Sequence, residues 1–167
     1  MHKPEKNMYG SLFWYNKKGQ IHREDGPAFI RPNGDCFWRK NGKRHRENGP
    51  AVELVNGQKE WWVDGKRHRE DGPALIKPNG DCFWYKNGKL HREDGPAVEY
   101  TNGYKAWWVN GERHRSDGPA VKYTSGSKEW YRNGKRHRKN GPALEYINGL
   151  KEWWVDGVFV KDKNAQT

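Results

Sequence analysis

Six copies of one short motif carry the residues of this sequence with the most chemical potential. Each copy is a His-Arg pair with Asp or Asn two residues after the Arg, directly before a Gly-Pro dipeptide. An imidazole next to an acid could serve as a general base with an orienting partner. The histidines stand 23 residues apart and are His22, His45, His68, His91, His114 and His137.

The repetition argues against catalysis, because a catalytic constellation normally occurs once in a chain. The acid is also replaced, by Asn48 and Asn140. We interpret the loop as a structural buttress, in which Asp or Asn bonds backbone N–H groups and Arg or His satisfies neighbouring carbonyls. Successive histidines would lie ~10 Å apart, too far to share a metal ion. The sequence therefore predicts no enzyme activity, no catalytic residue, no metal and no cofactor.

The elements that position these loops are β-hairpins. In the copy over 95–117, a run of β-forming residues meets a turn at Asn102-Gly103, and a second run stops at Asn110-Gly111. No stretch has the periodicity of an amphipathic helix. A fixed period of this length is typical of arrays whose units touch mainly their neighbours. We expect an all-β fold, an elongated array of about six to seven stacked antiparallel hairpins.

The hairpin register follows from charge pairing across the strands. A two-residue turn would place Glu53 opposite Glu60, whereas a three-residue turn with a bulged Gly places Glu53 opposite Lys59. We expect the three-residue turn. The same register opposes Glu99 with Lys105, Glu145 with Lys151 and, against the trend, Lys122 with Lys128.

A second rhythm of 46 residues overlies the first. The hairpins at 29–39 and 75–85 are near twins, and those at 52–62, 98–108 and 144–154 form another set. Either alternate hairpins meet different surroundings or the gene duplicated in pairs. Cys36 and Cys82 occupy the same place in the twins, ~19 Å apart in an open sheet. A disulfide needs Cα atoms within about 7 Å, so both are expected to be free thiols.

Composition sets the wider limits. Low hydrophobicity and a net charge of +11 favour disorder, but ten regularly spaced Trp indicate an ordered fold with a thin core. We expect one array over 1–160, with caps near 1–15 and 156–160, and a disordered tail over 161–167. Without a signal peptide or membrane span, the predicted location is the cytoplasm, or the host cytoplasm for a viral protein. Exposed edge strands would permit a homodimer.

Two columns of aromatic residues run along the repeats on opposite faces of the strands. One column must be core, and the other is either a second packed layer or an exposed binding stripe. Our leading hypothesis is a non-enzymatic scaffold that binds another protein through the second column and the loop arginines. These residues are Trp62, Tyr85, Trp108, Tyr131, Trp154, Arg46, Arg69, Arg92, Arg115 and Arg138.

The alternative partner is nucleic acid, which the positive net charge favours. Basic loops would line one edge of the array, with aromatic residues as stacking partners for bases. Acids follow most of these loops and would neutralise them. The sixth copy has no acid there and offers the most basic edge, formed by Lys135, Arg136, Arg138 and Lys139.

The string from an aromatic strand through NGKRHR to a second strand and another NG resembles the MORN repeat, a 23-residue hairpin unit. The PNGD turns at 32–35 and 78–81 match that family's turn. The loop differs, because His-Arg-x-Asp-Gly-Pro-Ala replaces the family's His-Gly-x-Gly. The chain is thus more similar to the variant MORN repeats of bacterial and viral proteins, some of them antitoxin-like. The resemblance covers Tyr9 to about Val160 and implies an attachment or scaffolding module.

Overall fold

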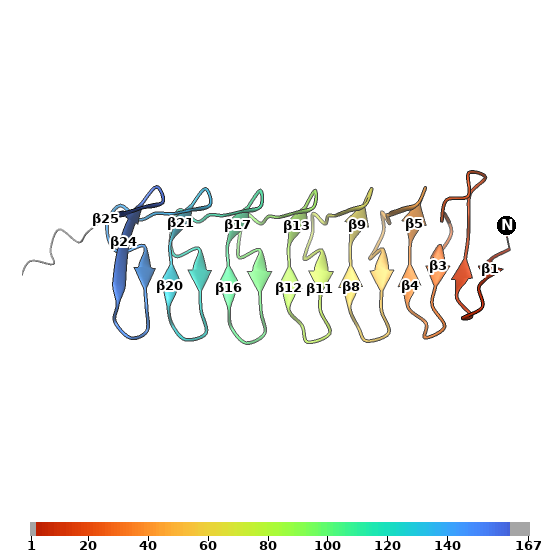
Figure 1. Cartoon of the computed structure of the whole chain (residues 1–167), viewed down its shortest axis with the longest axis horizontal. Helices are drawn as coiled ribbons and strands as arrows, with labels where there is room; N and C mark the ends of the chain where they lie inside the picture. The colour runs from red at the N-terminus through yellow and green to blue at the C-terminus, as the bar shows by residue number, and fades with distance from the viewer. Residues whose placement is uncertain (1–2, 161–167) are drawn as a thin grey trace, which may run out of the picture. The chain divides into compact units, whose positions relative to one another are not determined.

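The structure of the chain, a computed structural model, describes residues 3–160. Over those residues, strands, turns and irregular segments make up the whole fold (Figure 1), so the all-β prediction of repeated antiparallel hairpins is confirmed. The chain divides into two compact units, an N-terminal unit over 1–89 and a C-terminal unit over 90–167. The predicted tail at 161–167 lies outside the described residues.

The N-terminal unit has a main antiparallel sheet in which neighbouring strands follow the order of the chain. Its strands are β1 (Glu5–Lys6), β2 (Leu12–Phe13), β3 (Phe29–Ile30), β4 (Cys36–Phe37), β7 (Val52–Glu53), β8 (Lys59–Glu60), β11 (Leu75–Ile76) and β12 (Cys82–Phe83). Small two-stranded hairpins accompany this sheet. They are β5 (Arg39–Lys40) with β6 (Lys43–Arg44), and β9 (Trp62–Val63) with β10 (Lys66–Arg67). Strands β13 (Tyr85–Lys86) and β14 (Lys89–Leu90) flank the division between the units.

The C-terminal unit repeats this plan. Its main sheet contains β15 (Val98–Glu99), β16 (Lys105–Ala106), β19 (Val121–Lys122), β20 (Lys128–Glu129), β23 (Leu144–Glu145), β24 (Lys151–Val155) and β25 (Val158–Val160). Its small hairpins are β17 (Trp108–Val109) with β18 (Glu112–Arg113), and β21 (Tyr131–Arg132) with β22 (Lys135–Arg136). The predicted C-terminal cap forms β25, in which the Phe159 ring meets Trp154 edge to face at 5.5 Å.

The predicted three-residue turn is confirmed. Glu99 lies opposite Lys105, and Glu53 lies opposite Lys59. In the turn that joins Glu99 to Lys105, Gly103 has the positive φ of 96° that a bulged Gly adopts. The unfavourable Lys122 and Lys128 pair is also present.

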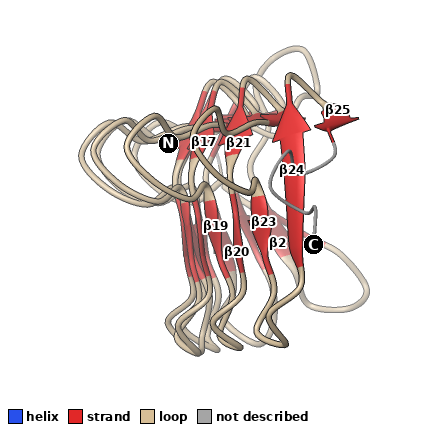
Figure 2. Ribbon diagram, turned by 90° about the vertical axis from the view of Figure 1, so that its left-hand side faces the viewer, coloured by secondary structure: helices blue, strands red, loops and turns tan. Residues whose placement is uncertain are grey.

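Five of the six repeats contain four short strands instead of the expected two, and the last contains three, β23 to β25. Asn110 and Gly111, with φ of 53° and 87°, form a two-residue type I′ turn that places Val109 opposite Glu112. The polar stretch after this turn is therefore a strand. At Trp107 the chain bends between the two hairpins, because its N–H bonds the Ala120 carbonyl at 2.8 Å and its carbonyl accepts the His114 N–H at 3.1 Å. In each unit the three-residue turns lie at one end of the main-sheet strands, and the loops project near the other end (Figure 2).

The core is thin and rests on small side chains. All six alanines of the Gly-Pro-Ala triplets are completely buried, and the next residue in most copies is a buried Val or Leu. Alanine suits this position because the backbone N–H of the Trp in the preceding repeat approaches its carbonyl to 2.7–3.0 Å. Two charged residues, Glu60 and Glu129, share this buried layer. Cys36 and Cys82 both keep their thiols, as predicted, and each Sγ donates to a backbone carbonyl at 3.3 Å.

Candidate interaction surface

Each repeated histidine holds the turn of the following repeat. In all six copies the imidazole Nδ1 accepts the backbone N–H of the Asn or Asp that opens the next type I′ turn. The six N···N distances lie between 3.0 and 3.2 Å. The buttress interpretation assigned carbonyls to the histidine. That part of the prediction is wrong. The histidine ring accepts a backbone N–H and does not donate to a carbonyl, because the next turn places an amide donor beside the ring.

This contact requires one tautomer of the ring. In His45, His68, His114 and His137, a side-chain oxygen of the same Asn or Asp also lies 2.8–3.1 Å from Nδ1. An imidazole that accepts at Nδ1 carries its ring proton on Nε2. In four copies that nitrogen faces a carboxylate two residues later, as in His68, whose Nε2 lies 3.1 Å from Glu70. The ring lone pair that a general base would use is therefore occupied by a backbone amide.

In five copies the arginine after the histidine stacks on a tryptophan of the first aromatic column. The Arg46 guanidinium lies 3.9 Å from the Trp38 ring centroid and donates to the Pro50 carbonyl at 3.0 Å. The expectation that this Arg satisfies a carbonyl is confirmed. The same stacking joins Arg23 to Trp14, Arg69 to Trp61, Arg115 to Trp107 and Arg138 to Trp130.

Carboxylates at the loop tips complete this cluster. The Arg23 Nε donates to Asp25 at 2.8 Å, and this hydrogen bond lowers the pKa of the Asp25 carboxyl from its ordinary value. The same effect of the neighbouring arginine lowers the pKa of three equivalent residues, Asp71, Asp94 and Asp117. These loop carboxylates stay exposed to solvent, so the loop edge ends in acids although its sequence is rich in bases.

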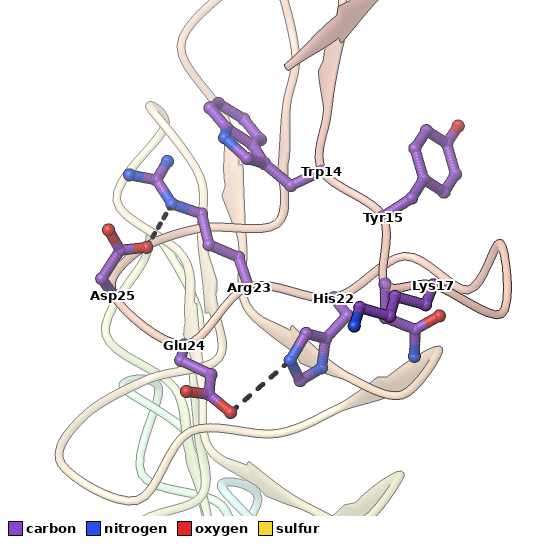
Figure 3. Close-up of a pocket in the computed structure, with 8 residues that line it drawn as sticks. Trp14, Tyr15, Lys17, His22, Arg23, Glu24 and Asp25 are labelled. Atoms are coloured by element: carbon purple, nitrogen blue, oxygen red, sulfur yellow. Dashed lines mark hydrogen bonds and ion pairs between the residues drawn. The ribbon is translucent and has the colours of Figure 1, made fainter. Parts of the chain in front are cut away.

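Grooves open beside and between these loops. The first is a pocket of about 330 Å³ where Trp14 and Tyr15 stand opposite His22 and Arg23 (Figure 3). A groove of about 750 Å³ separates the first two loops, and one of about 190 Å³ recurs in the C-terminal unit. Their linings share Trp, His, Arg and acidic side chains. They include Trp38, His45, Arg46 and Glu47 in the larger groove, and Trp107, His114, Arg115 and Asp117 in the smaller.

The predicted contact residues fall on two different surfaces. The loop arginines line the grooves, as Arg46 and Arg115 show. The second aromatic column instead lies half-buried among other arginines. Trp62 lies between Arg44 and Arg67, with guanidinium-to-centroid distances of 4.8 and 5.0 Å.

Those arginines and rings cover the buried face of the main sheet. The Trp62 indole N–H donates to Glu60 at 2.8 Å, and Arg67 donates to the same carboxylate at 3.2 Å. In the C-terminal unit, Arg113 lies 5.4 Å from Trp108 and 5.2 Å from Tyr131. The remaining members, Tyr85 and Trp154, contact Arg67 and Arg136. The second column is thus arranged as a packed layer of alternating rings and guanidinium groups.

Ala106 leaves a defect in this layer. It occupies the position of Glu60, so Trp108 has no carboxylate beside its indole N–H. Among the described residues, the buried Trp108 Nε1 and Arg113 Nε atoms have no hydrogen-bond partner. In the repeat with Glu60, the equivalent indole and guanidinium nitrogens both reach the carboxylate.

The basic edge considered for nucleic acid is also divided. Arg138 stacks on Trp130 and bonds Glu145 at 2.7 Å, and Arg136 donates to the Tyr131 hydroxyl at 3.3 Å. Lys135 and Lys139 are exposed. The four residues of this basic run therefore enter three different surroundings. The first-column tryptophans and the loop acids, which the sequence analysis did not include as contact residues, join the loop arginines in the grooves.

The fold and its repeated contacts define the class, an all-β hairpin-repeat protein. No family model matches the chain, and no curated protein does. Within residues 3–160, no helix is long and apolar enough to span a membrane. No cluster of three or more potential metal ligands occurs in that same part of the chain.

Proposed function

We propose that this chain is a non-enzymatic scaffold that binds another protein along its loop side. The observation that carries the proposal is the recurrence of one groove type, built from Trp, Arg, His and exposed carboxylates, in both units. Aromatic residues and arginine dominate the energetics of protein interfaces, and repeat arrays use repeated surfaces for binding. The resemblance to variant MORN repeats, which implies an attachment module, agrees with this proposal.

The partner we propose carries basic side chains. Exposed carboxylates form the rims of these grooves. They include Glu47 in the larger groove of the N-terminal unit and Asp117 in the smaller groove of the C-terminal unit. Below them lie the half-buried rings of Trp38 and Trp107. A Lys or Arg side chain of the partner would meet a carboxylate at the rim and apolar surface beneath.

Site-specific photocrosslinking tests the proposal. A photoreactive amino acid replaces Asn48 or Ser116, which are exposed at the loops, and matched controls carry it at Asn56 or Asn102, which are exposed in the three-residue turns. We expect one discrete partner band from both loop positions and none from the turn positions. Crosslinks of equal yield from the turns, or none from the loops, would contradict binding through the loop side.

A further inference from the structure

We propose that a lysine ridge on the N-terminal unit binds the phosphate backbone of nucleic acid without reading its sequence. The ridge lies on the small hairpins, beside the loop grooves proposed for protein binding. Lys17 and Lys40 also line two of those grooves, whereas Lys43, Lys66 and Lys89 line neither. It consists of Lys17, Lys18, Lys40, Lys43, Lys66, Lys86 and Lys89, all exposed.

Backbone geometry creates the ridge. The type I′ turns begin at Asn41, Asp64 and Asn87. The hairpins that contain them, which start with β5, β9 and β13, lie side by side along one edge of the N-terminal unit (Figure 1). The Gly N–H of each turn donates to the preceding hairpin. Gly65 N–H bonds the Arg44 carbonyl at 2.9 Å, and Gly88 N–H bonds the Arg67 carbonyl at 2.8 Å. Equivalent lysines are thereby held at regular steps of ~10 Å.

The lysine stems lie across the glycines of the next turn. A Cβ atom on Gly65 would lie 3.7 Å from the Lys43 stem, and one on Gly88 would lie 3.6 Å from the Lys66 stem. Packing of the methylene groups on the backbone leaves the ammonium groups toward solvent. The charges are thus positioned by the fold although the side chains are exposed.

A basic pocket begins the ridge. Its volume is about 540 Å³, and its lining includes Lys17, Lys18 and Lys43 together with the amides of Asn16 and Asn41. Three ammonium groups around one hollow match the oxygens of a phosphate group, whereas the Asn16 amide donates to Gln20 and Asn41, each at 3.0 Å. The first loop supplies Lys17 and Lys18.

The ridge is not neutralised from within. Lys86 lies 3.4 Å from Glu70, but within residues 3–160 no carboxylate lies within 4.0 Å of the Lys40, Lys43 or Lys66 ammonium group. Lys40 also stands directly opposite Lys43 in the β5–β6 pair. Like charges across a strand pair destabilise a hairpin, and an anionic partner would relieve this repulsion.

The chemistry of the ridge favours a nucleic-acid backbone over other polyanions. Duplex DNA carries one charge per ~1.7 Å, so lysines at any regular step find phosphates. Lysine acts as a point charge, without the fork that reads a carboxylate or a base edge. Aromatic rings near the ridge, such as Trp62, are covered by arginines and cannot stack on bases. Binding should therefore be independent of sequence.

The C-terminal unit lacks such a ridge. The equivalent positions hold Val109 and Glu112 in one hairpin, and Val155 and Val158 in another. Only Arg132 and Lys135 keep the basic pair. The inference concerns the N-terminal unit alone.

Fluorescence anisotropy with a labelled duplex of about 20 base pairs tests this inference across a salt series. The full chain is compared with the triple variant Lys43→Gln, Lys66→Gln, Lys89→Gln. The matched control is Lys59→Gln, Lys105→Gln, Lys128→Gln, which removes three exposed lysines from the main sheet. Circular dichroism checks that both variants fold.

We expect the ridge variant to bind at least tenfold more weakly at about 50 mM salt. Its slope of log affinity against log salt should fall by about 2.7, since each contact contributes about 0.9. The control and duplexes of shuffled sequence should bind as the original does. Equal weakening by the control, absence of binding at low salt, or equally tight binding of polyglutamate would each overturn the assignment. These outcomes leave the photocrosslinking result on the loops unaffected.

Discussion

The imidazole Nδ1 of His45 accepts a 3.2 Å hydrogen bond from the backbone N–H of Asp64, 19 residues further along the chain. The Asp64 side-chain oxygen also lies 3.0 Å from the same nitrogen. A neutral ring can therefore accept the amide, and a protonated ring can donate to the carboxylate of the same residue. Repetition of this contact links successive repeats and explains why the motif occurs six times.

Replacement of a central histidine should reduce stability. His91→Ala leaves the Asn110 N–H without the acceptor that lies 3.1 Å away, and the expected loss in the free energy of unfolding is about 0.5–1.5 kcal/mol, because water can reach this exposed amide. His91→Asn returns an acceptor oxygen near the Nδ1 position and should recover part of the loss. Urea unfolding measures both, and equal stability of the Ala variant and the original chain would show that the contact contributes nothing.

Ala106→Glu should stabilise the chain. The new carboxylate would accept from Trp108 Nε1 and Arg113 Nε, as Glu60 does from Trp62 and Arg67 in its own repeat. We expect a gain of about 1 kcal/mol in urea unfolding, because two buried donors acquire a partner. Ala106→Leu, which fills the space without an acceptor, is the control. A loss with Glu and a gain with Leu would contradict the role given to the carboxylate.

Repeat stacking could be predicted from the sequence, since the 23-residue period and the turn residues appear in every copy. The hairpin register could also be predicted, because Glu53 and Lys59 lie opposite each other across the strands only with the three-residue turn. The surroundings of the side chains of Lys43-Arg44-His45-Arg46 could not be predicted from the sequence. Strand alternation separates the first two side chains, and the contact of His45 is with a turn 19 residues away.

The buried glutamates were equally hidden in the sequence. Glu60 lies in the core layer because Trp62, Gln58 and Arg67 all reach its carboxylate. A glutamate in a charged strand sequence is expected on the surface. Burial of Glu60 becomes favourable only because side chains from other strands and turns supply hydrogen-bond donors to its carboxylate.

Acid should weaken the fold through Asp35. Its carboxylate accepts the Val55 backbone N–H at 3.0 Å, and this bond, with the Asn33 amide, lowers the pKa of Asp35 below its ordinary value of 3.8. A lowered folded-state pKa gives stability that is present above the unfolded value and lost as pH falls through the folded value. The loss should thus occur below about pH 3.8.

Urea unfolding from about pH 6 to about pH 2 measures this dependence in the original chain and in Asp35→Asn. The variant should be less stable at the upper pH and should lose less stability on acidification. An identical acid profile in the two proteins would exclude Asp35 as a contributor.

Alkali should weaken the fold through Tyr123. Burial, and then the hydrogen bond of 2.7 Å to Glu129, raises the pKa of the Tyr123 hydroxyl far above its ordinary value of 10.0. A raised folded-state pKa gives stability that is full below the unfolded value and lost as pH rises above it. Tyrosinate absorbance and circular dichroism should show part of the ionisation only when the chain unfolds. Tyr123→Phe should diminish that late component, and an unchanged titration would assign it elsewhere.

The contact between each histidine and the turn of the next repeat is the link on which the stacking of the repeats most depends. NMR measurement of the nitrogen–nitrogen coupling across hydrogen bonds, at a pH where the rings are neutral, detects these contacts directly. We predict coupling from the Nδ1 of each repeated histidine to one backbone amide 19 residues later, with the ring proton on Nε2. Rings protonated on Nδ1 and without coupling to those amides would contradict the account.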